Sequence, residues 1–142
     1  MIIADTNVVS EFMKDSPHHG VLAWARTLGP ADLTISVVTV EEIERGLGRL
    51  PAGRRRNDLE QRWHHLLDAY SDTIAVYDVN AAQATARLLV DALDRGRPMA
   101  LADAQIAGIC LARSAALATR NVKDFAHVGD LTLINPFDHE LP

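Results

Sequence analysis

The sequence predicts one α/β domain over residues 1–142, with a central, mainly parallel sheet of about five strands and helices on both faces. Short apolar runs alternate along the chain with longer segments of helical periodicity. Strands that alternate with helices pair in parallel, because each right-handed crossover lays a helix on one face of the sheet. The chain has 142 residues, 48% hydrophobic and 23% charged, which suits a single core.

The apolar runs and helical periods give the order of the elements. Strands are predicted at residues 1–4, 33–37, 73–79, 115–118 and 131–134. Helices are predicted at residues 8–13, 16–29, 39–49, 54–70, 81–94 and 101–113. Three helix starts rest on capping residues. Ser16 followed by Pro17 is typical of a first turn, Thr39 with Glu42 fits a capping box, and Asn80 is the expected cap of its helix.

Composition excludes several classes of protein. Asp5 interrupts the N-terminal apolar run, and no run approaches the ~18 apolar residues of a membrane span. We therefore expect a soluble, cytoplasmic protein. Cys110 is the single cysteine and lies in an apolar helical stretch, so we interpret it as a buried hydrophobic residue rather than a nucleophile.

The charge pattern argues against a protein that coats nucleic acid, because the net charge is −5 and such binding depends on neutralising phosphates. Twelve of the fourteen basic residues are arginines, and six fall in one span: Arg45, Arg49, Arg54, Arg55, Arg56 and Arg62. They could form an edge that contacts phosphates. The alternative, slightly favoured, is a solvated helix surface on which Asp58 and Glu60 form salt bridges.

Acidic residues in four separate contexts suggest the chemistry. Asp5 ends the first strand, Glu42 and Asp103 lie in the first turns of helices, and Asn121 and Asp124 follow another apolar run. Ligands bind at the carboxyl ends of parallel strands. Carboxylates within ~4–6 Å of one another cannot all stay ionised without a cation, and hard oxygen ligands select magnesium or manganese. The pattern therefore predicts metal-dependent phosphodiester hydrolysis.

Taken singly, each acid also has a purely structural interpretation. Asp5 could cap a helix, Glu42 could complete the capping box, Asp103 could favour a helix N-terminus, and Asp124 could lie in a surface turn. A phosphoryl-transfer or receiver domain is a further alternative, but Asp5-Thr6-Asn7 lacks the second aspartate of a D-x-D motif.

The six histidines do not suggest a histidine-based ribonuclease. His18 with His19, and His64 with His65, are adjacent pairs, and neighbours in a helix point to different faces. We therefore expect neither pair to form a joint site.

Four motifs in order identify a family resemblance. They are I-A-D-T-N from residue 3, S-x-x-T-x-x-E-I-x-x-G over residues 36–46, G-R-P-M with L-A-D-A-Q-I-A over 96–107, and A-T-R-N-V-K-D-F over 118–125. In these motifs the chain resembles the PIN-domain ribonucleases, specifically the VapC-type toxins of bacterial toxin–antitoxin pairs, nearest their FitB-like branch. The resemblance implies a PIN-like fold, an acidic pocket that binds Mg²⁺ or Mn²⁺, and cleavage of single-stranded RNA. It also implies a homodimer and an inhibitory, VapB-type antitoxin.

The resemblance assigns roles by position. Asp5, Glu42 and Asp103 match the metal-binding acids of the family, and Asn7 matches its polar residue after the first acid. Thr6 could hydrogen-bond within the same cluster. The sequence departs from the family at Asn121, where many relatives carry a fourth acid. Asp124 would take up that role if its segment is helical.

Two further hypotheses follow from the resemblance. Because the fourth acid is missing, a non-catalytic PIN-like binding module that acts through a protein partner stays an alternative. Because several helices carry more apolar side chains than a small core needs, we expect some of them to form a groove for an amphipathic antitoxin segment that points a basic side chain at the acids. These side chains are Phe12, Met13, Val21, Leu22, Trp24, Leu47, Leu50, Trp63 and Leu66.

Overall fold

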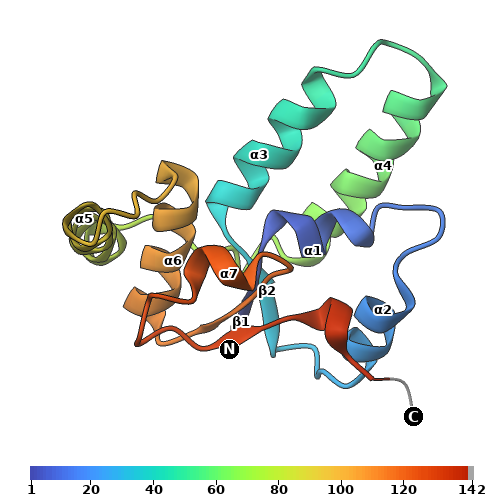
Figure 1. Cartoon of the computed structure of the whole chain (residues 1–142). Helices are drawn as coiled ribbons and strands as arrows, with labels where there is room; N and C mark the ends of the chain where they lie inside the picture. The colour runs from blue at the N-terminus through green and yellow to red at the C-terminus, as the bar shows by residue number, and fades with distance from the viewer. Residues whose placement is uncertain (141–142) are drawn as a thin grey trace.

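A four-stranded parallel sheet lies between two groups of helices in the computed structural model, which describes residues 1–140 (Figure 1). The strands are β1 (Ile2–Ala4), β2 (Leu33–Ile35), β3 (Ala116–Ala118) and β4 (Leu133–Ile134). Their order in the sheet is β2-β1-β3-β4, and the register aligns Ala4 with Ile35 and Ala118. The α/β fold class with a parallel sheet is confirmed.

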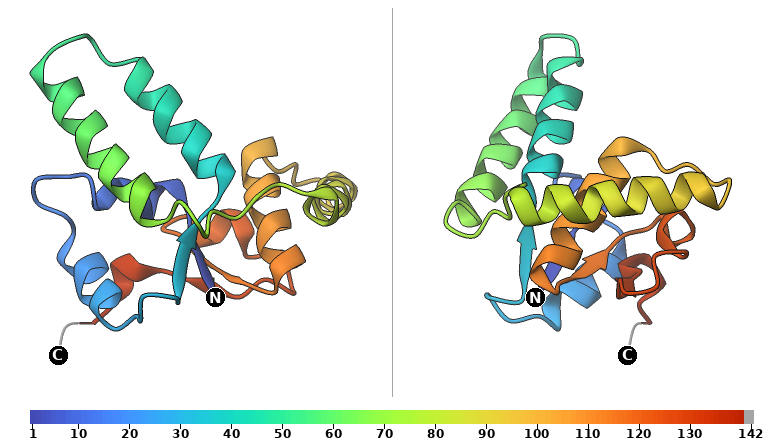
Figure 2. Two further views of the ribbon diagram at one scale, coloured as in Figure 1. Left: turned by 180° about the vertical axis from the view of Figure 1, so that it is seen from behind. Right: turned by 90° about the vertical axis from the view of Figure 1, so that its left-hand side faces the viewer.

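The helices connect the strands in three groups. β1 and β2 are joined by α1 (Thr6–Glu11) and α2 (His19–Arg26), and β3 and β4 by α7 (Val122–Phe125). Between β2 and β3 lie α3 (Val37–Gly48), α4 (Arg54–Ala69), α5 (Val79–Asp94) and α6 (Leu101–Arg113), and a 3₁₀ helix, η1 (Pro136–Asp138), follows β4. The hairpin of α3 and α4 projects away from the sheet, whereas α5 crosses α6 on the other side (Figure 2).

Successive side chains of a strand point to opposite faces of the sheet, so the short strands contribute to two cores, one on each face. Ile3 and Leu117 belong to the core under α5, α6 and α7. Ala4 and Ala118, one residue further along each strand, belong to the core formed with α1 to α4. Both faces are therefore covered, as parallel sheets require.

The strand order places a binding position at one edge of the sheet. The chain passes from β1 to β2 on one side, and then crosses β1 to reach β3 on the other. The order thus reverses between β1 and β3, and their carboxyl ends form the crevice where open α/β sheets bind ligands. Asp5 and Thr119 are the residues that directly follow these two strands.

The predicted fifth strand is wrong. Residues 73–79 contribute only one parallel bridge, between Ser36 and Ala75, in which the Val37 N–H donates to the Ala75 carbonyl at 3.0 Å. The segment leaves the sheet because the Asp78 side chain caps α5, accepting a hydrogen bond from the Ala81 N–H at 2.9 Å. Asn80, the predicted cap, lies inside the helix.

Two helix starts near the N-terminus also differ from the prediction. α1 begins at Thr6 rather than at residue 8, because Asp5 caps it. α2 begins at His19 and not at residues 16–17, because the Nδ1 atom of His18 accepts a hydrogen bond from the Gly20 N–H at 3.1 Å. The His18 N–H is held in turn by the buried carboxylate of Glu11, at 2.9 Å.

The predicted capping box of α3 is wrong as well. Ser36 is the cap, and its hydroxyl accepts from the Thr39 N–H at 3.4 Å, so that the helix begins at Val37. Glu42 therefore lies beyond the first turn and has no capping role. The helices predicted at 54–70 and 101–113 match α4 and α6 within one residue.

The arginine-rich span follows the salt-bridge interpretation for three of its six members. Arg45 pairs with Glu41, Arg56 with Glu60, and Arg62 with Asp15. These pairs lie on the α3–α4 hairpin or tie it to the loop after α1, and surface pairs of this kind contribute little to stability.

Two remaining expectations concern burial and membranes. Cys110 is fully buried, and burial raises the pKa of its thiol to about 12, as expected of a small hydrophobic residue. Within residues 1–140, no helix combines the length and the apolar character needed to cross a membrane.

Candidate active site

The Asp5 carboxylate is fixed by three hydrogen bonds at the carboxyl end of β1. Its Oδ1 accepts from the Thr6 N–H at 2.8 Å, as the cap of α1. Its Oδ2 accepts from the Thr119 hydroxyl at 2.8 Å and from the Asn7 side-chain amide at 3.3 Å. Asp5 is only 7% exposed. The capping and the functional interpretations of Asp5 are therefore compatible, because the cap orients the carboxylate.

Thr119 is a site residue that was not predicted from the sequence. It is fully buried, and its Oγ1 also accepts a hydrogen bond from the Asn121 N–H at 3.0 Å. Because Ala4 pairs with Ala118, Thr119 follows β3 as Asp5 follows β1. A hydroxyl residue directly after a buried apolar run was the available signal, but its partner could be identified only from the register.

Glu42 joins the same cluster through Thr6. The Thr6 hydroxyl donates to Glu42 Oε1 at 2.9 Å and lies 3.2 Å from the Thr39 hydroxyl. Glu42 is half-buried, one turn further into α3 than the predicted capping box would place it. Thr6 therefore links the first acid, through its backbone N–H, with the second acid, through its hydroxyl.

Asn7 connects the cluster to the segment after β3. Its side-chain Nδ2 donates to Asp5, and its Oδ1 accepts from the Arg120 N–H at 3.0 Å. Both ends of the amide are used, which fixes its orientation. The structure thus brings Thr6 and Asn7, the two predicted supporting residues, into contact with the acids.

Asp103 lies in the first turn of α6 and shares the electrostatic field of the other acids. Burial, followed by the charges of Asp5, Asp124 and Glu42, raises the pKa of Asp103 to about 6. Burial also raises the pKa of Asp5, although the hydrogen bonds from Thr119, Thr6 and Asn7 act in the opposite direction. The charges of Asp5, Asp124 and Glu42 thus act on Asp103, after the larger effect of burial.

Asp124 and Asn121 differ in their relation to this region. Asp124 lies on the short helix α7, is exposed, and contributes its negative charge to both Asp5 and Asp103. Asn121 precedes α7, and its side chain makes no hydrogen bond with residues 1–140. The charge of Asp124 therefore acts on Asp5 and Asp103, whereas Asn121 is joined to the cluster only by its backbone N–H, which donates to Thr119 Oγ1 at 3.0 Å.

The donor set fits a hard divalent cation. Asp5, Glu42, Asp103 and Asp124 offer carboxylate oxygens, without a thiol or an imidazole among them. Within residues 1–140, no three acidic, histidine or cysteine side chains already converge as a closed metal-binding group.

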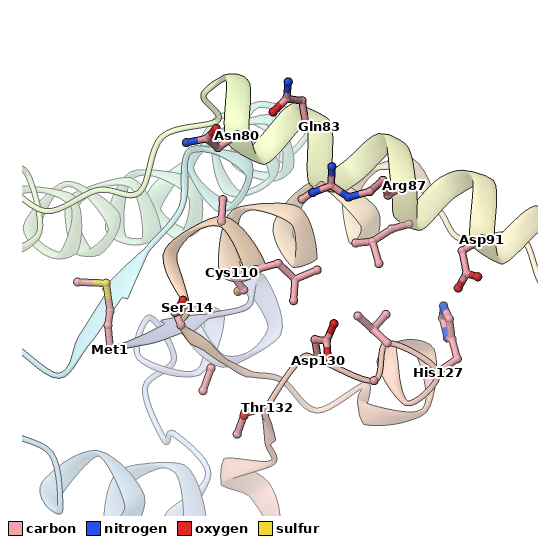
Figure 3. Close-up of a pocket in the computed structure, with 18 of the residues that line it drawn as sticks. Met1, Asn80, Gln83, Arg87, Asp91, Cys110, Ser114, His127, Asp130 and Thr132 are labelled. Carbon is pink, nitrogen blue, oxygen red and sulfur yellow. The ribbon is translucent and has the colours of Figure 1, made fainter.

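A cavity of about 1050 Å³ lies elsewhere (Figure 3). It opens between α5 and the loop after α7, and Met1, Ala116 and Thr132 from the amino ends of the strands line it. It is therefore separated by the length of the sheet from the acids, which gather at the carboxyl ends.

A smaller, mostly apolar groove of about 240 Å³ lies directly beside Glu42, between α1, α3 and α4. Its lining consists of Thr6, Ser10, Met13, Lys14, Glu42, Ile43, Gly46, Leu47 and Leu59. Met13 and Leu47, two of the nine apolar residues expected to form a groove, line it, whereas Val21, Trp24 and Trp63 are buried in the core. A groove exists, but Ile43 and Leu59, which were not predicted from the sequence, form much of it.

Comparison with known proteins agrees with this geometry. The PIN domain family matches residues 2–131. The chain is 35% identical over 139 residues to the VapC ribonuclease Y4jK of Sinorhizobium fredii, covering 97% of this chain and 99% of that protein. It is 32% identical over 138 residues to the toxin FitB of Neisseria gonorrhoeae, covering 96% and 99%.

Solved structures give the same result. The crystal structure of FitAcB from Neisseria gonorrhoeae has a TM-score of 0.88 at 32% identity, covering 97% of this chain and 99% of that chain. The DNA-bound VapBC of Salmonella typhimurium shares the fold, with a TM-score of 0.77 at 21% identity over 95% and 97% of the two chains. With its fold, its ordered motifs and its full-length relatives in agreement, the chain belongs to the PIN domain family.

Proposed function

We propose that this protein is a metal-dependent endoribonuclease and the toxin of a VapBC-type toxin–antitoxin pair. One observation carries the proposal: a network of hydroxyl and amide groups holds Asp5 and Glu42 together at the switch point of the sheet, and the charges of Asp5, Glu42 and Asp124 act on Asp103. The likeness to a VapC ribonuclease over 97% of the chain supports the assignment to RNA.

Some side chains of the site would bind the metal ion, and others orient these ligands. Asp5, Glu42, Asp103 and Asp124 would hold Mg²⁺ or Mn²⁺, with Asn121 as a neutral oxygen ligand at the edge. Such an ion lowers the pKa of a water molecule and stabilises charge on a scissile phosphate during in-line displacement. Thr119 and Asn7 keep Asp5 Oδ2 in place, and Thr6 keeps Glu42 turned towards Asp5. Hydrolysis of this kind needs no histidine and no RNA 2′-hydroxyl as nucleophile.

An assay of RNA cleavage with Mn²⁺, with Mg²⁺ and with EDTA tests the proposal. Wild-type protein should cut single-stranded RNA only when a divalent ion is present. Asp5→Asn should lower the rate about 100-fold or more, because the amide keeps the cap of α1 but loses the charge that attracts the cation. A thermal melt should show that the variant is folded.

Two outcomes would contradict the proposal. Undiminished cleavage by Asp5→Asn would remove Asp5 from the site. A wild-type protein that cuts no RNA with either ion, yet binds its partner, would favour the alternative of a non-catalytic PIN-like module. Two features support this alternative: Asn121 is neutral, and no three acids converge within the described residues.

The proposed partner is a VapB-type antitoxin. The apolar groove between α1, α3 and α4 ends at Glu42, so that a bound amphipathic segment could extend a basic side chain to the acids. A likeness of 32% identity and TM-score 0.89 to FitAB, solved with a DNA fragment, supports an assembly of this type. A homodimer is part of the same proposal, because the family resemblance implies it.

A further inference from the structure

A second group of side chains is connected to the acidic cluster through the backbone of Arg120 and takes no part in the hydrogen bonds of the acids. The guanidinium of Arg120 lies over the ring of Phe137, with its Cζ 4.6 Å from the ring centroid. Phe137 contacts His18, at 5.1 Å between ring centroids and 57° between planes. His18 stacks on His19, at 4.7 Å and 17°. These four planar side chains, from the β3–α7 connection, η1 and the start of α2, are called the stacking platform below.

The platform is attached to the acidic cluster at the Arg120 end. The Arg120 N–H donates to Asn7 Oδ1 at 3.0 Å, and Asn7 Nδ2 donates to Asp5 Oδ2 at 3.3 Å. Two hydrogen bonds therefore connect the backbone of Arg120 with the first acid. The preceding residue, Thr119, donates to the same carboxylate oxygen. Any movement of the Arg120 backbone would disturb Asp5, so the position of the platform relative to the acids is fixed.

The other end of the platform is held by close packing. The Phe137 N–H donates to Asn135 Oδ1 at 3.1 Å, which fixes the turn that presents the ring. The ring of His18 is oriented by the hydrogen bond that its Nδ1 accepts from Gly20. A Cβ on Gly20 would lie 3.2 Å from the Phe137 carbonyl oxygen, so α2 and η1 approach closely there. The expectation that His18 and His19 point apart is wrong, because His18 precedes the helix.

Exposure and charge indicate what the platform can bind. Arg120 and His19 are exposed, and Phe137 and His18 are half-buried. Among residues 1–140, no carboxylate pairs with the Arg120 guanidinium. An unpaired planar cation on an aromatic ring offers both a face for stacking and a charge for a phosphate. Single-stranded RNA presents both groups, because its bases stack on aromatic rings and on guanidinium planes.

We propose that the stacking platform holds the nucleotide next to the scissile phosphodiester of a single-stranded RNA. One base stacks on the guanidinium of Arg120, which lies over the Phe137 ring, and the His18–His19 pair extends the surface for a second base. The inference rests on the proposed ribonuclease function, and it assigns Arg120 and Phe137 as substrate-binding residues.

The test measures the binding of two labelled probes by fluorescence anisotropy, with EDTA present so that metal-dependent cleavage cannot consume them. One probe is a fluorescein-labelled RNA 12-mer of adenylate, and the other is the same 12-mer with abasic sites at its central positions. Arg120→Lys keeps the charge but loses the plane, and Phe137→Leu keeps the apolar contact but loses the ring. Each should weaken binding of the adenylate probe roughly 10-fold and leave binding of the abasic probe unchanged. Arg113→Lys, an exposed arginine at the end of α6, is the matched control.

The outcomes separate this inference from the proposed function. Unchanged affinity for adenylate RNA in both variants, or equal weakening with both probes, overturns the stacking platform. If a variant binds both RNA probes as the wild type does but binds the antitoxin more weakly, the stacking platform is also overturned. The surface is then assigned to the protein partner. If the wild-type protein cuts no RNA but the two variants bind adenylate RNA weakly, the ribonuclease proposal fails and the platform stands. Arg120→Lys leaves the core intact, so it decides the question even if Phe137→Leu folds poorly.

Discussion

At the scale of single residues, the candidate site depends on a hydroxyl that is itself neither charged nor exposed. Thr119 donates to Asp5 Oδ2 at 2.8 Å from a fully buried position. Groups that orient a ligating carboxylate commonly matter almost as much as the carboxylate. The family motif contains this threonine, but its role becomes visible only when the two strand ends lie side by side.

Thr119→Val should lower metal-dependent cleavage roughly 10- to 100-fold, because the variant keeps the shape of the side chain but removes the hydrogen bond to Asp5. Cleavage rates at saturating Mn²⁺ measure the effect. Thr119→Ser, which retains the hydroxyl, is the control and should stay within a few-fold of wild type. Wild-type activity in the valine variant would show that Asp5 needs no such support.

Asp103→Asn should abolish cleavage and yet stabilise the metal-free protein above pH 6. The pKa of Asp103 rises from 3.8 to about 6 on folding, so the folded state binds its proton more tightly than the unfolded state does. The protonated Asp103 contributes fully to the free energy of unfolding below pH 3.8, and this contribution is lost as the pH rises through about 6. The neutral amide of Asp103→Asn does not titrate, so its contribution does not depend on pH. Above pH 6 the free energy of unfolding of the variant should exceed that of the wild type by about 1 kcal/mol, once solvent screening at this half-exposed group is allowed for.

Melting temperatures of the wild type and of Asp103→Asn, measured with EDTA from pH 4 to pH 8, check this prediction. The two curves should coincide near pH 4 and separate by about 3 °C above pH 6. Asp72→Asn, at an exposed position in the turn after α4, should melt like the wild type throughout. A variant that is less stable than wild type at pH 8 would contradict the assignment of Asp103 to a crowded acidic cluster.

Asp124→Asn should raise the Mn²⁺ concentration needed for half-maximal cleavage about 10-fold, because the cluster loses one of its charges. Asn121→Asp should lower that concentration, since it adds a charge at the edge of the same region. Metal titrations of cleavage by both variants make the comparison. An unchanged requirement in Asp124→Asn would reduce the charged site to Asp5, Glu42 and Asp103.

At the scale of elements, the sequence predicts the types of most segments but not where several of them begin. The strands at residues 2–4, 116–118 and 133–134 are continuous apolar runs, and the strand at 33–35 is interrupted only by Thr34, so local composition identifies them. The starts of α2, α3 and α5 differ because more than one residue can cap each helix. The choice of His18 depends on its contact with Glu11 and that of Ser36 on its position directly after β2, whereas Asp78 caps α5 through a local bond from Ala81.

The same distinction explains which site residues were predicted. Asp5, Glu42 and Asp103 are charged residues in ordered motifs, and the sequence shows them without knowledge of the fold. Thr119 and Arg120 act through partners more than 100 positions away in the chain, so their contacts depend on the pairing of β1 with β3. Glu42 was expected in a capping box, and its real partner, Thr6, is 36 positions away.

The crossing of α5 and α6 gives a prediction at this scale. A Cβ on Gly108 would lie 2.1 Å from the Thr85 hydroxyl and 2.8 Å from the Ala81 carbonyl, so that Gly108→Ala must push the two helices apart. We expect a loss of about 1–3 kcal/mol in the free energy of unfolding, measured by urea denaturation. Gly46→Ala, in an exposed part of α3 with no atom within 4 Å of the new Cβ, should instead gain about 0.5–1 kcal/mol. Equal stability of the two variants would contradict this close contact between α5 and α6.

At the scale of the whole molecule, the apolar groove beside Glu42 is the expected position of the antitoxin. Co-expression with the small protein encoded beside it should yield a stable complex in which RNA cleavage is suppressed. Ser10→Trp would fill the groove, and should weaken the complex while the metal-dependent nuclease activity persists. The control is Ser71→Trp, in the exposed turn after α4. A neighbour that binds both variants equally well, or that binds without inhibiting cleavage, would place the interface elsewhere.

The separation of the acids along the chain has a consequence for the timing of synthesis. Asp5, Glu42, Asp103 and Asp124 come from four elements, and Thr119 must pair its strand with β1 before Asp5 is held. A ribosome that adds about 5–20 residues per second must therefore complete nearly all of the 142 residues before any active site can form. A chain that stops before Asp124 is expected to lack the complete site. An inhibitor that is already folded could then bind as soon as the site forms.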